Sequence, residues 1–180
     1  MKCLILILVT VLNPAFYSIY AQESDKSEYK EFKHQRISLV IGHTHVPKGS
    51  PDAGTSGAVI VPSWGFDYEY WFNDKWGLGL HNDLELLTYV VDNNELGELK
   101  RERPVIVSMV GLFNPIYNLV VYIGPGIELE KHESFFVYRV GLEYEFEINE
   151  SWELSPGVFY DNKEGLFDTW SIGLSVAKKF

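Results

Sequence analysis

Cysteine is almost missing from this sequence, because Cys3 carries the one thiol among 180 residues. A chain with one cysteine forms no internal disulfide, so an exported form of it must be held together by its fold alone. Basic residues are also scarce, with 15 Lys and Arg against 25 Asp and Glu and a formal net charge of -10. This balance argues against nucleic acid as a partner, because nucleic-acid binding needs clustered Lys and Arg.

Beyond the first residues, the sequence also lacks long apolar runs. The N-terminal segment has a positive charge at Lys2, an apolar stretch over 4–12 and a small residue, Ala21, at its end. This pattern predicts a secretory signal peptide over 1–21, with cleavage after Ala21 or after Gln22. A lipidated cysteine stands at the end of the apolar stretch, whereas Cys3 lies before that stretch, so we expect no lipidation of Cys3. No later segment has the roughly 20 apolar residues that a membrane-spanning helix needs.

In the remaining sequence, apolar and polar residues alternate with a period of two. In the segment 134–148 bulky apolar residues occupy every second position from Phe136 to Ile148, and Arg139 and Glu143 stand between them. Successive side chains of a β-strand point to opposite faces, so this segment has one apolar and one charged face. Such patterns predict eight strands, at 36–46, 58–72, 76–90, 103–113, 119–130, 134–148, 152–161 and 167–180. The segments 36–46 and 103–113 are apolar on both faces for part of their length, so the sequence does not decide which of their faces points into the barrel.

The connections between these segments differ in length. Three are tight, at 73–75, 114–118 and 149–151, whereas the first and third are longer and polar, at 47–57 and 91–102. Short turns at one end and longer loops at the other are typical of bacterial outer-membrane barrels, whose strands need about 9–11 residues. The sequence therefore predicts an all-β fold, an eight-stranded antiparallel up-and-down transmembrane β-barrel. It would span 36–180, after the signal peptide at 1–21 and a polar N-terminal lead-in at 22–35.

The two faces of the predicted strands carry residues of different size. Glycines and charged residues share one face, which suits the narrow lumen of an eight-stranded barrel. A soluble barrel or sandwich with an apolar interior would alternate as well, but the bulky aromatics would not all fit inside. They also gather near strand ends, as in the girdle of a membrane protein. The expected girdle consists of Tyr70, Phe72, Trp76, Phe146, Trp152, Trp170 and Phe180.

The small and charged face contains the candidate site residues. We expect a lumenal polar network of Ser63, Asp67, Glu69, His81, Asp83, Glu85, Arg139, Glu143, Glu145 and Glu147. If the turn at 73–75 sets the register, Asp67 lies opposite His81 and Ser63 lies opposite Glu85. Ser63, Asp67 and His81 have the residue types of a nucleophilic triad, yet a filled barrel has no room for a substrate. A hydrogen-bonded interior network is therefore the expectation.

Two further groups raise the question of metal binding. Glu143, Glu145, Glu147 and Glu153 crowd one face, where either ion pairing with Arg139, Arg36 and Lys179 or a divalent cation could compensate them. Pairing is the favoured interpretation. His43 and His45 share one face of the first strand, but two ligands are too few for a metal site, so contact with lipopolysaccharide headgroups or water is the favoured interpretation. We expect no catalytic residue, no cofactor and no metal.

The last strand, WSIGLSVAKKF, resembles the C-terminal signal that the barrel-assembly machinery recognises. The chain from 36 to 180 resembles the eight-stranded, porin-like group of the OmpA transmembrane domain, OmpX and OmpW. The stretches HTHVPKG and PSWGFDYEYWFNDKWGLGLHNDLE resemble uncharacterised outer-membrane barrels of Bacteroidetes. The resemblance implies a location in the bacterial outer membrane, in contact with lipid and lipopolysaccharide. It implies no catalytic residues.

The leading hypothesis is a non-enzymatic barrel with a structural or surface-binding role through its extracellular loops, at 47–57 and 91–102. The alternative is a lipid A-modifying enzyme, because His132-Glu133-Ser134 with Glu143 or Glu145 is similar to the His, Ser and Glu of PagL-type deacylases. The remainder of that family's motif is missing. A narrow pore is disfavoured, because eight strands leave no open channel.

Overall fold

The structure, a computed structural model, describes residues 32–51, 57–93, 97–131 and 133–180. The predicted signal peptide and residues 22–31 of the predicted lead-in lie outside these ranges. The regular elements of the described residues are β-strands. No helix in this part of the chain has the length and apolar character needed to cross a membrane.

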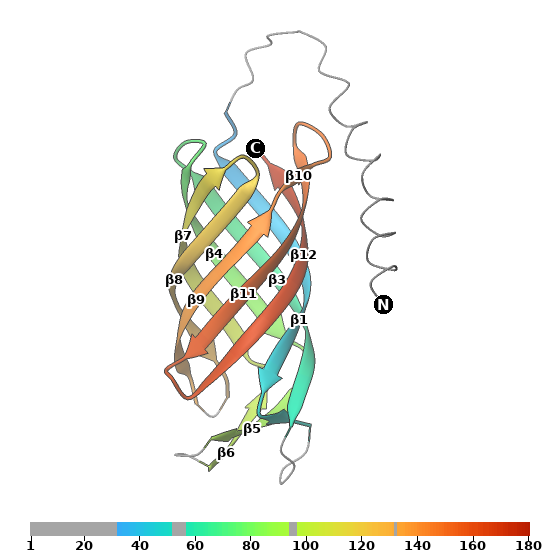
Figure 1. Cartoon of the computed structure of the whole chain (residues 1–180), viewed down its shortest axis with the longest axis vertical. Coiled ribbons are helices and arrows are strands. Elements are labelled where there is room, and N and C mark those ends of the chain that lie inside the picture. Colours follow the sequence, from blue (N-terminus) through green and yellow to red (C-terminus); the bar gives the residue numbers. More distant parts are fainter. Residues whose placement is uncertain (1–31, 52–56, 94–96, 132) are drawn as a thin grey trace, which may run out of the picture. The chain divides into compact units, whose positions relative to one another are not determined.

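The strands close into one antiparallel barrel (Figure 1). Its wall consists of β1 (Gln35–Pro47), β3 (Ala58–Trp71), β4 (Trp76–Glu85), β7 (Val105–Ile116), β8 (Leu119–Leu129), β9 (Phe135–Tyr144), β11 (Trp152–Lys163) and β12 (Phe167–Lys179). Neighbours in this order pair with one another, and β12 pairs with β1 to complete the circle. Closure leaves the wall without an unpaired edge. The eight-stranded antiparallel barrel predicted from the sequence is confirmed.

Two tight turns at one end of the barrel use the same local chemistry. Asn73 begins the turn between β3 and β4, and its side-chain oxygen accepts hydrogen bonds from the backbone N–H groups of Lys75 and Trp76, at 2.9 and 3.0 Å. Asn149 precedes β11 and does the same for Ser151 and Trp152, at 2.9 and 3.1 Å. Asparagine favours such turns because its side chain can replace a backbone acceptor. We call this end, where the described chain also ends at Phe180, the turn end.

The opposite end, the loop end, carries a second sheet that the sequence did not predict. It has the order β2-β5-β6, from β2 (Gly49–Ser50), β5 (Thr88–Asn93) and β6 (Gly97–Glu102). Figure 1 shows β5 and β6 beyond the barrel wall. The predicted strand 76–90 is therefore wrong in extent, because β4 stops at Glu85, and the connection 91–102 is not an irregular loop.

An apolar core explains why this second sheet folds. Tyr89, Val91 and Leu99 are buried on its inner face. They pack in one cluster, the apolar cap, together with the barrel residues Val46, Val61, Phe135 and Phe167. Burial of such side chains is the main favourable term in folding, so these residues fold into strands although their sequence resembles a polar connection.

Two other strands have features that the period of two did not predict. The predicted strand 134–148 breaks at Glu145, whose backbone N–H donates to the carbonyl of Asn118 at 2.8 Å, and β10 (Phe146–Glu147) continues it. In β7, whose facing was open, Val110 and Leu112 point inward. They belong to an apolar cluster inside the lumen with Trp71, Val120 and Tyr122. The lumen is therefore not polar throughout.

The outer surface of the wall is apolar. Leu39, Trp64, Ile123 and Ile172 are 59, 57, 67 and 70% exposed. A soluble monomer rarely exposes apolar patches larger than a few hundred Å². The wall instead has the apolar band of a transmembrane barrel, with polar side chains inside.

This facing predicts the effect of placing a charge on the outer surface. We expect Ile123→Arg, in the middle of β8, to lower the free energy of unfolding in lipid vesicles by about 2–4 kcal/mol. Tyr117→Arg, in the exposed turn before β8, is the control and should change it by less than about 0.5 kcal/mol. Urea titration followed by tryptophan fluorescence measures both. Equal, small effects would contradict a lipid-facing surface.

Candidate functional site

The lumen contains many buried charges, with acids in excess. Among the described residues that are buried, eight are Asp or Glu and four are Arg or Lys. Burying a charge is costly unless a partner compensates it, and here each base must serve more than one acid. The ion pairs form three groups along the barrel, which we call the turn-end, middle and loop-end clusters.

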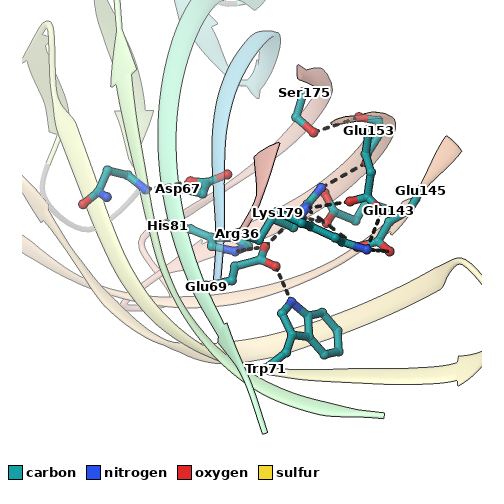
Figure 2. Close-up of polar contacts among 12 residues, drawn as sticks. Arg36, Asp67, Glu69, Trp71, His81, Glu143, Glu145, Glu153, Ser175 and Lys179 are labelled. Carbon is teal, nitrogen blue, oxygen red and sulfur yellow. Dashed lines mark hydrogen bonds and ion pairs between the residues drawn. The ribbon is translucent and has the colours of Figure 1, made fainter. Parts of the chain in front are cut away.

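The turn-end cluster surrounds Arg36 of β1, which is 1% exposed (Figure 2). Its guanidinium donates to Glu69 and Glu143, both at 2.8 Å, and to Glu153 at 3.2 Å. A further nitrogen donates to the hydroxyl of Ser155 at 3.0 Å. Arginine suits this position because its planar fork presents several donors to several carboxylates at once.

Lys179 and two aromatic side chains complete the turn-end cluster. Lys179 forms ion pairs with Glu153 and, at 3.4 Å, with Glu145. Glu69 also accepts a hydrogen bond from the indole N–H of Trp71 at 3.0 Å, and His81 Nε2 lies 3.2 Å from it. Figure 2 shows these groups converging on Arg36 from separate strands. The cluster therefore links β1, β3, β4, β9, β11 and β12 across the lumen.

The middle cluster surrounds Arg139 of β9. Its guanidinium binds Asp161 through two nitrogens, at 2.7 and 2.8 Å, and pairs with Asp83 across the lumen. The guanidinium carbon Cζ of Arg139 lies 4.2 Å from the ring centroid of Phe159. A cavity of about 20 Å³ adjoins this group, lined by Asp67, His81 and Asp83 among others. That volume holds a water molecule but no organic substrate.

The loop-end cluster lies directly beneath the apolar cap. Lys163 forms ion pairs with Glu85, at 3.4 Å, and with Glu128. The guanidinium of Arg101, on β6, forms an ion pair with Glu128 and donates a hydrogen bond to the carbonyl of Glu133 at 2.9 Å. The second sheet is thus tied to the barrel by a buried ion pair as well as by apolar packing.

A tyrosine of the second sheet adds another tie to the loop-end cluster. Burial and the nearby carboxylates of Glu85 and Glu128 raise the pKa of Tyr89 well above its usual value. Its hydroxyl therefore stays protonated, and it donates to Glu85 at 2.6 Å.

The predicted register of the candidate residues is confirmed, but they form no triad. Asp67 pairs with His81 and Ser63 with Glu85 across β3 and β4. His81, however, contacts Glu69, and Asp67 accepts the backbone N–H of Asn82 at 3.1 Å.

The other predicted lumenal residues fall into two groups. Glu147 is exposed at the turn end, in contrast to its predicted lumenal position, because the strand breaks at Glu145 and both residues of β10 are exposed although they still pair with β11. The structure buries the remaining predicted lumenal residues, Glu69, Asp83, Glu85, Arg139, Glu143 and Glu145.

Several lumenal residues were missed by the sequence analysis. Arg101 and Lys163 lay in segments that were interpreted as connections, and their acceptor Glu128 was not among the predicted lumenal residues. The alternation in the sequence could have identified Lys163, because it lies two residues after Asp161 and therefore on the same inward face of β11. Arg101 likewise lies two residues after Leu99 on the inner face of β6.

The metal alternatives find no support in the geometry. No group of three or more His, Cys, Asp or Glu in the described residues is arranged to hold a metal ion. Glu143, Glu145 and Glu153 contact Arg36 or Lys179 instead. His43 and His45 are exposed on the outer face of β1.

The predicted girdle residues are all on the outer surface. Tyr70, Phe72, Trp76, Phe146, Trp152, Trp170 and Phe180 are between 41 and 57% exposed. The register places Trp76 beside Phe113 and Trp152 beside Lys178 at the turn end, whereas Trp170 lies beside His45 towards the loop end.

Ser134 and the two glutamates of the deacylase hypothesis lie towards opposite ends of β9. His132 lies outside the described residues, and Ser134 is exposed before the start of β9. Glu143 and Glu145 are buried at the other end of this strand, in contact with Arg36. These acids cannot orient a histidine beside Ser134.

The turn-end cluster predicts that Arg36 is needed for stability. Arg36→Met leaves several buried carboxylates without their main partner, so we expect a loss of about 3–5 kcal/mol in the free energy of unfolding. Arg103→Met removes an exposed arginine and should cost less than about 0.5 kcal/mol. Urea unfolding in lipid vesicles compares the two variants. If they prove equally stable, Arg36 does not hold the cluster together.

Comparisons with known proteins support the fold. No family model matches the chain, and no curated protein matches its sequence. Among solved structures, the attachment invasion locus protein Ail of Yersinia pestis, in complex with the heparin analogue sucrose octasulfate, is similar with a TM-score of 0.55 and 14% identity. That match covers 83% of this chain and 100% of Ail.

Two further solved structures have the same architecture. Neisserial surface protein A gives a TM-score of 0.54 at 12% identity, over 81% of this chain and 97% of its own. The outer membrane protein OprG of Pseudomonas aeruginosa gives 0.54 at 17% identity, over 84% and 98%. The closed antiparallel barrel of this chain agrees with these matches. The chain has the fold of the small eight-stranded outer-membrane β-barrels.

Proposed function

We propose that this protein is an integral outer-membrane barrel without enzymatic activity, whose wall anchors a surface-binding sheet on the outside of the cell. The observation that carries the proposal is the folded sheet β2-β5-β6 at the loop end, which is fixed to the barrel by the apolar cap and by Arg101. Membrane anchoring alone would not need such an ordered extension.

The second sheet has two different faces. Its inner face buries Tyr89, Val91 and Leu99, whereas Thr88, Asp92, Glu98 and Lys100 are exposed. Exposed residues on a rigid support are a common way to build a binding surface. The exposed charges are mixed in sign, so a partner would meet both acidic and basic groups.

The filled lumen supports a role that does not involve transport. The three ion-pair clusters and the apolar lumenal residues cross the interior at successive levels, and the cavity of about 20 Å³ admits only water. The names of two proteins of this fold, an attachment invasion locus protein and a Neisserial surface protein, are consistent with a role at the cell surface.

Lipid and the barrel-assembly machinery are the partners that this proposal implies inside the envelope. The apolar outer band would contact lipid and lipopolysaccharide. The final strand β12 presents Trp170, Ile172, Leu174 and Val176 outward, which is the kind of amphipathic strand that the assembly machinery would recognise.

Site-directed labelling tests the location and the orientation together. Residues 22–180 contain no cysteine, so Lys100→Cys on β6 and Lys75→Cys at the turn end each introduce a single thiol after the predicted cleavage site. On intact cells we expect a membrane-impermeant maleimide to label Lys100→Cys alone. Lys75→Cys should react only after the outer membrane is permeabilised. Labelling of Lys75→Cys on intact cells, or of neither variant, would overturn the proposed orientation.

A further inference from the structure

Two histidines interrupt the apolar outer surface of the barrel. His43 and His45 alternate with inward-facing residues on β1 and are exposed. Across the strand pairs, His43 lies between Pro62 and Ile172, which is 70% exposed. The neighbouring outward residue on β1 towards the turn end is Ile41, which is 55% exposed. His43 is therefore a polar side chain in apolar surroundings.

His45 has an aromatic neighbour. It lies between Ile60 on β3 and Trp170 on β12, and Trp170 in turn pairs with Tyr160, with ring centroids 4.8 Å apart. The two imidazoles, the indole and the phenol thus form one outward patch, the histidine patch. Neither imidazole of the pair has a hydrogen-bond partner among the described residues, whereas the side chain of the outward Asn82 donates to the backbone carbonyl of Phe66 at 2.8 Å.

The height of the histidine patch along the barrel axis indicates which leaflet of the membrane it contacts. A strand rises about 3.3 Å per residue and tilts by about 40°, so His43 lies roughly 20 Å along the barrel axis from the turn-end residue Gln35. The apolar band of such barrels is about 25 Å tall. His43 and His45 therefore lie near its upper boundary, where the acyl chains of the outer leaflet meet their headgroups.

We propose that His43 and His45 bind a phosphate group of lipid A in the outer leaflet, with Trp170 and Tyr160 packing against the attached sugar. Polar side chains on the lipid-facing side of a membrane protein are costly, and they usually mark a functional contact. Imidazole N–H groups donate hydrogen bonds, and phosphate oxygens are strong anionic acceptors. Lys48, exposed just beyond the end of β1, adds a positive charge on the headgroup side.

The surrounding residues argue against other chemistry at the patch. Thr44, the hydroxyl between the two histidines, points inward and contacts Ser171 at 2.8 Å. The direct cross-strand neighbours of His43 and His45 are apolar or aromatic, so they offer neither an acid to orient an imidazole nor an aliphatic hydroxyl to act as a nucleophile. The acid on this face of β12, Asp168, accepts hydrogen bonds from Asn162, at 2.7 Å, and from Tyr160. A binding role fits these surroundings better than a catalytic one.

This inference rests on the proposed outer-membrane location, but its test does not require cells. The full chain, purified in nanodiscs, is titrated with bisphosphorylated lipid A and with enzymatically dephosphorylated lipid A, and binding is followed by tryptophan fluorescence and by native mass spectrometry. We expect tighter binding of the phosphorylated form. The double variant H43F/H45F should weaken that binding about tenfold or more, and it should abolish the preference for phosphate.

The control variant is His34→Phe, which removes an exposed imidazole at the turn end, just before β1, and should leave lipid A binding unchanged. Equal binding of the two lipid A forms by the native chain, or unchanged binding by H43F/H45F, would overturn the inference. Phosphate-dependent binding that is lost in H43F/H45F supports it even if the surface labelling of cells fails. The two proposals therefore fail separately.

Discussion

The compensation of charges inside a closed wall is the constraint on which the remaining structure depends. Because the outer side of the wall is apolar, the charged residues of the strands point inward, where each needs a partner. Arg36, Arg139 and Lys163 meet this need at three levels of the barrel. Some of these pairs join neighbouring strands, as Arg36 with Glu69 and Arg139 with Asp161 do. Others join strands that are not neighbours in the wall, namely Arg36 with Glu143, Arg139 with Asp83 and Lys163 with Glu85, so the clusters also brace the barrel across its lumen.

The same constraint separates the two roles of the molecule. The lumen is occupied by its own side chains, which leaves the outer surface and the loop end as the regions that can meet other molecules. At the loop end, the second sheet is fixed by the apolar cap, by Arg101 and by the hydroxyl of Tyr89. The filled lumen and the ordered sheet therefore support the same proposal, a membrane anchor that presents a surface.

The sequence predicts the local features of this architecture and misses the non-local ones. The period of two determines which residues of β9 face inward, and the turn at Asn73 determines that Asp67 lies opposite His81. The sheet β2-β5-β6 was missed because its core depends on contacts with Val46 and Phe167, which lie far away in the sequence. The partners of Arg36 were only suggested, since ring closure, not spacing, brings β1 beside β12.

The central claim is that lipid solvates the outer surface while the lumen is shielded from it. Quenching by brominated acyl chains tests this claim through two variants that each keep one of the five tryptophans. We expect strong quenching when Trp170, which is 52% exposed, is kept, and little quenching when Trp71, which is 6% exposed and hydrogen-bonded to Glu69, is kept. Equal quenching of the two, or no quenching of Trp170, would contradict it.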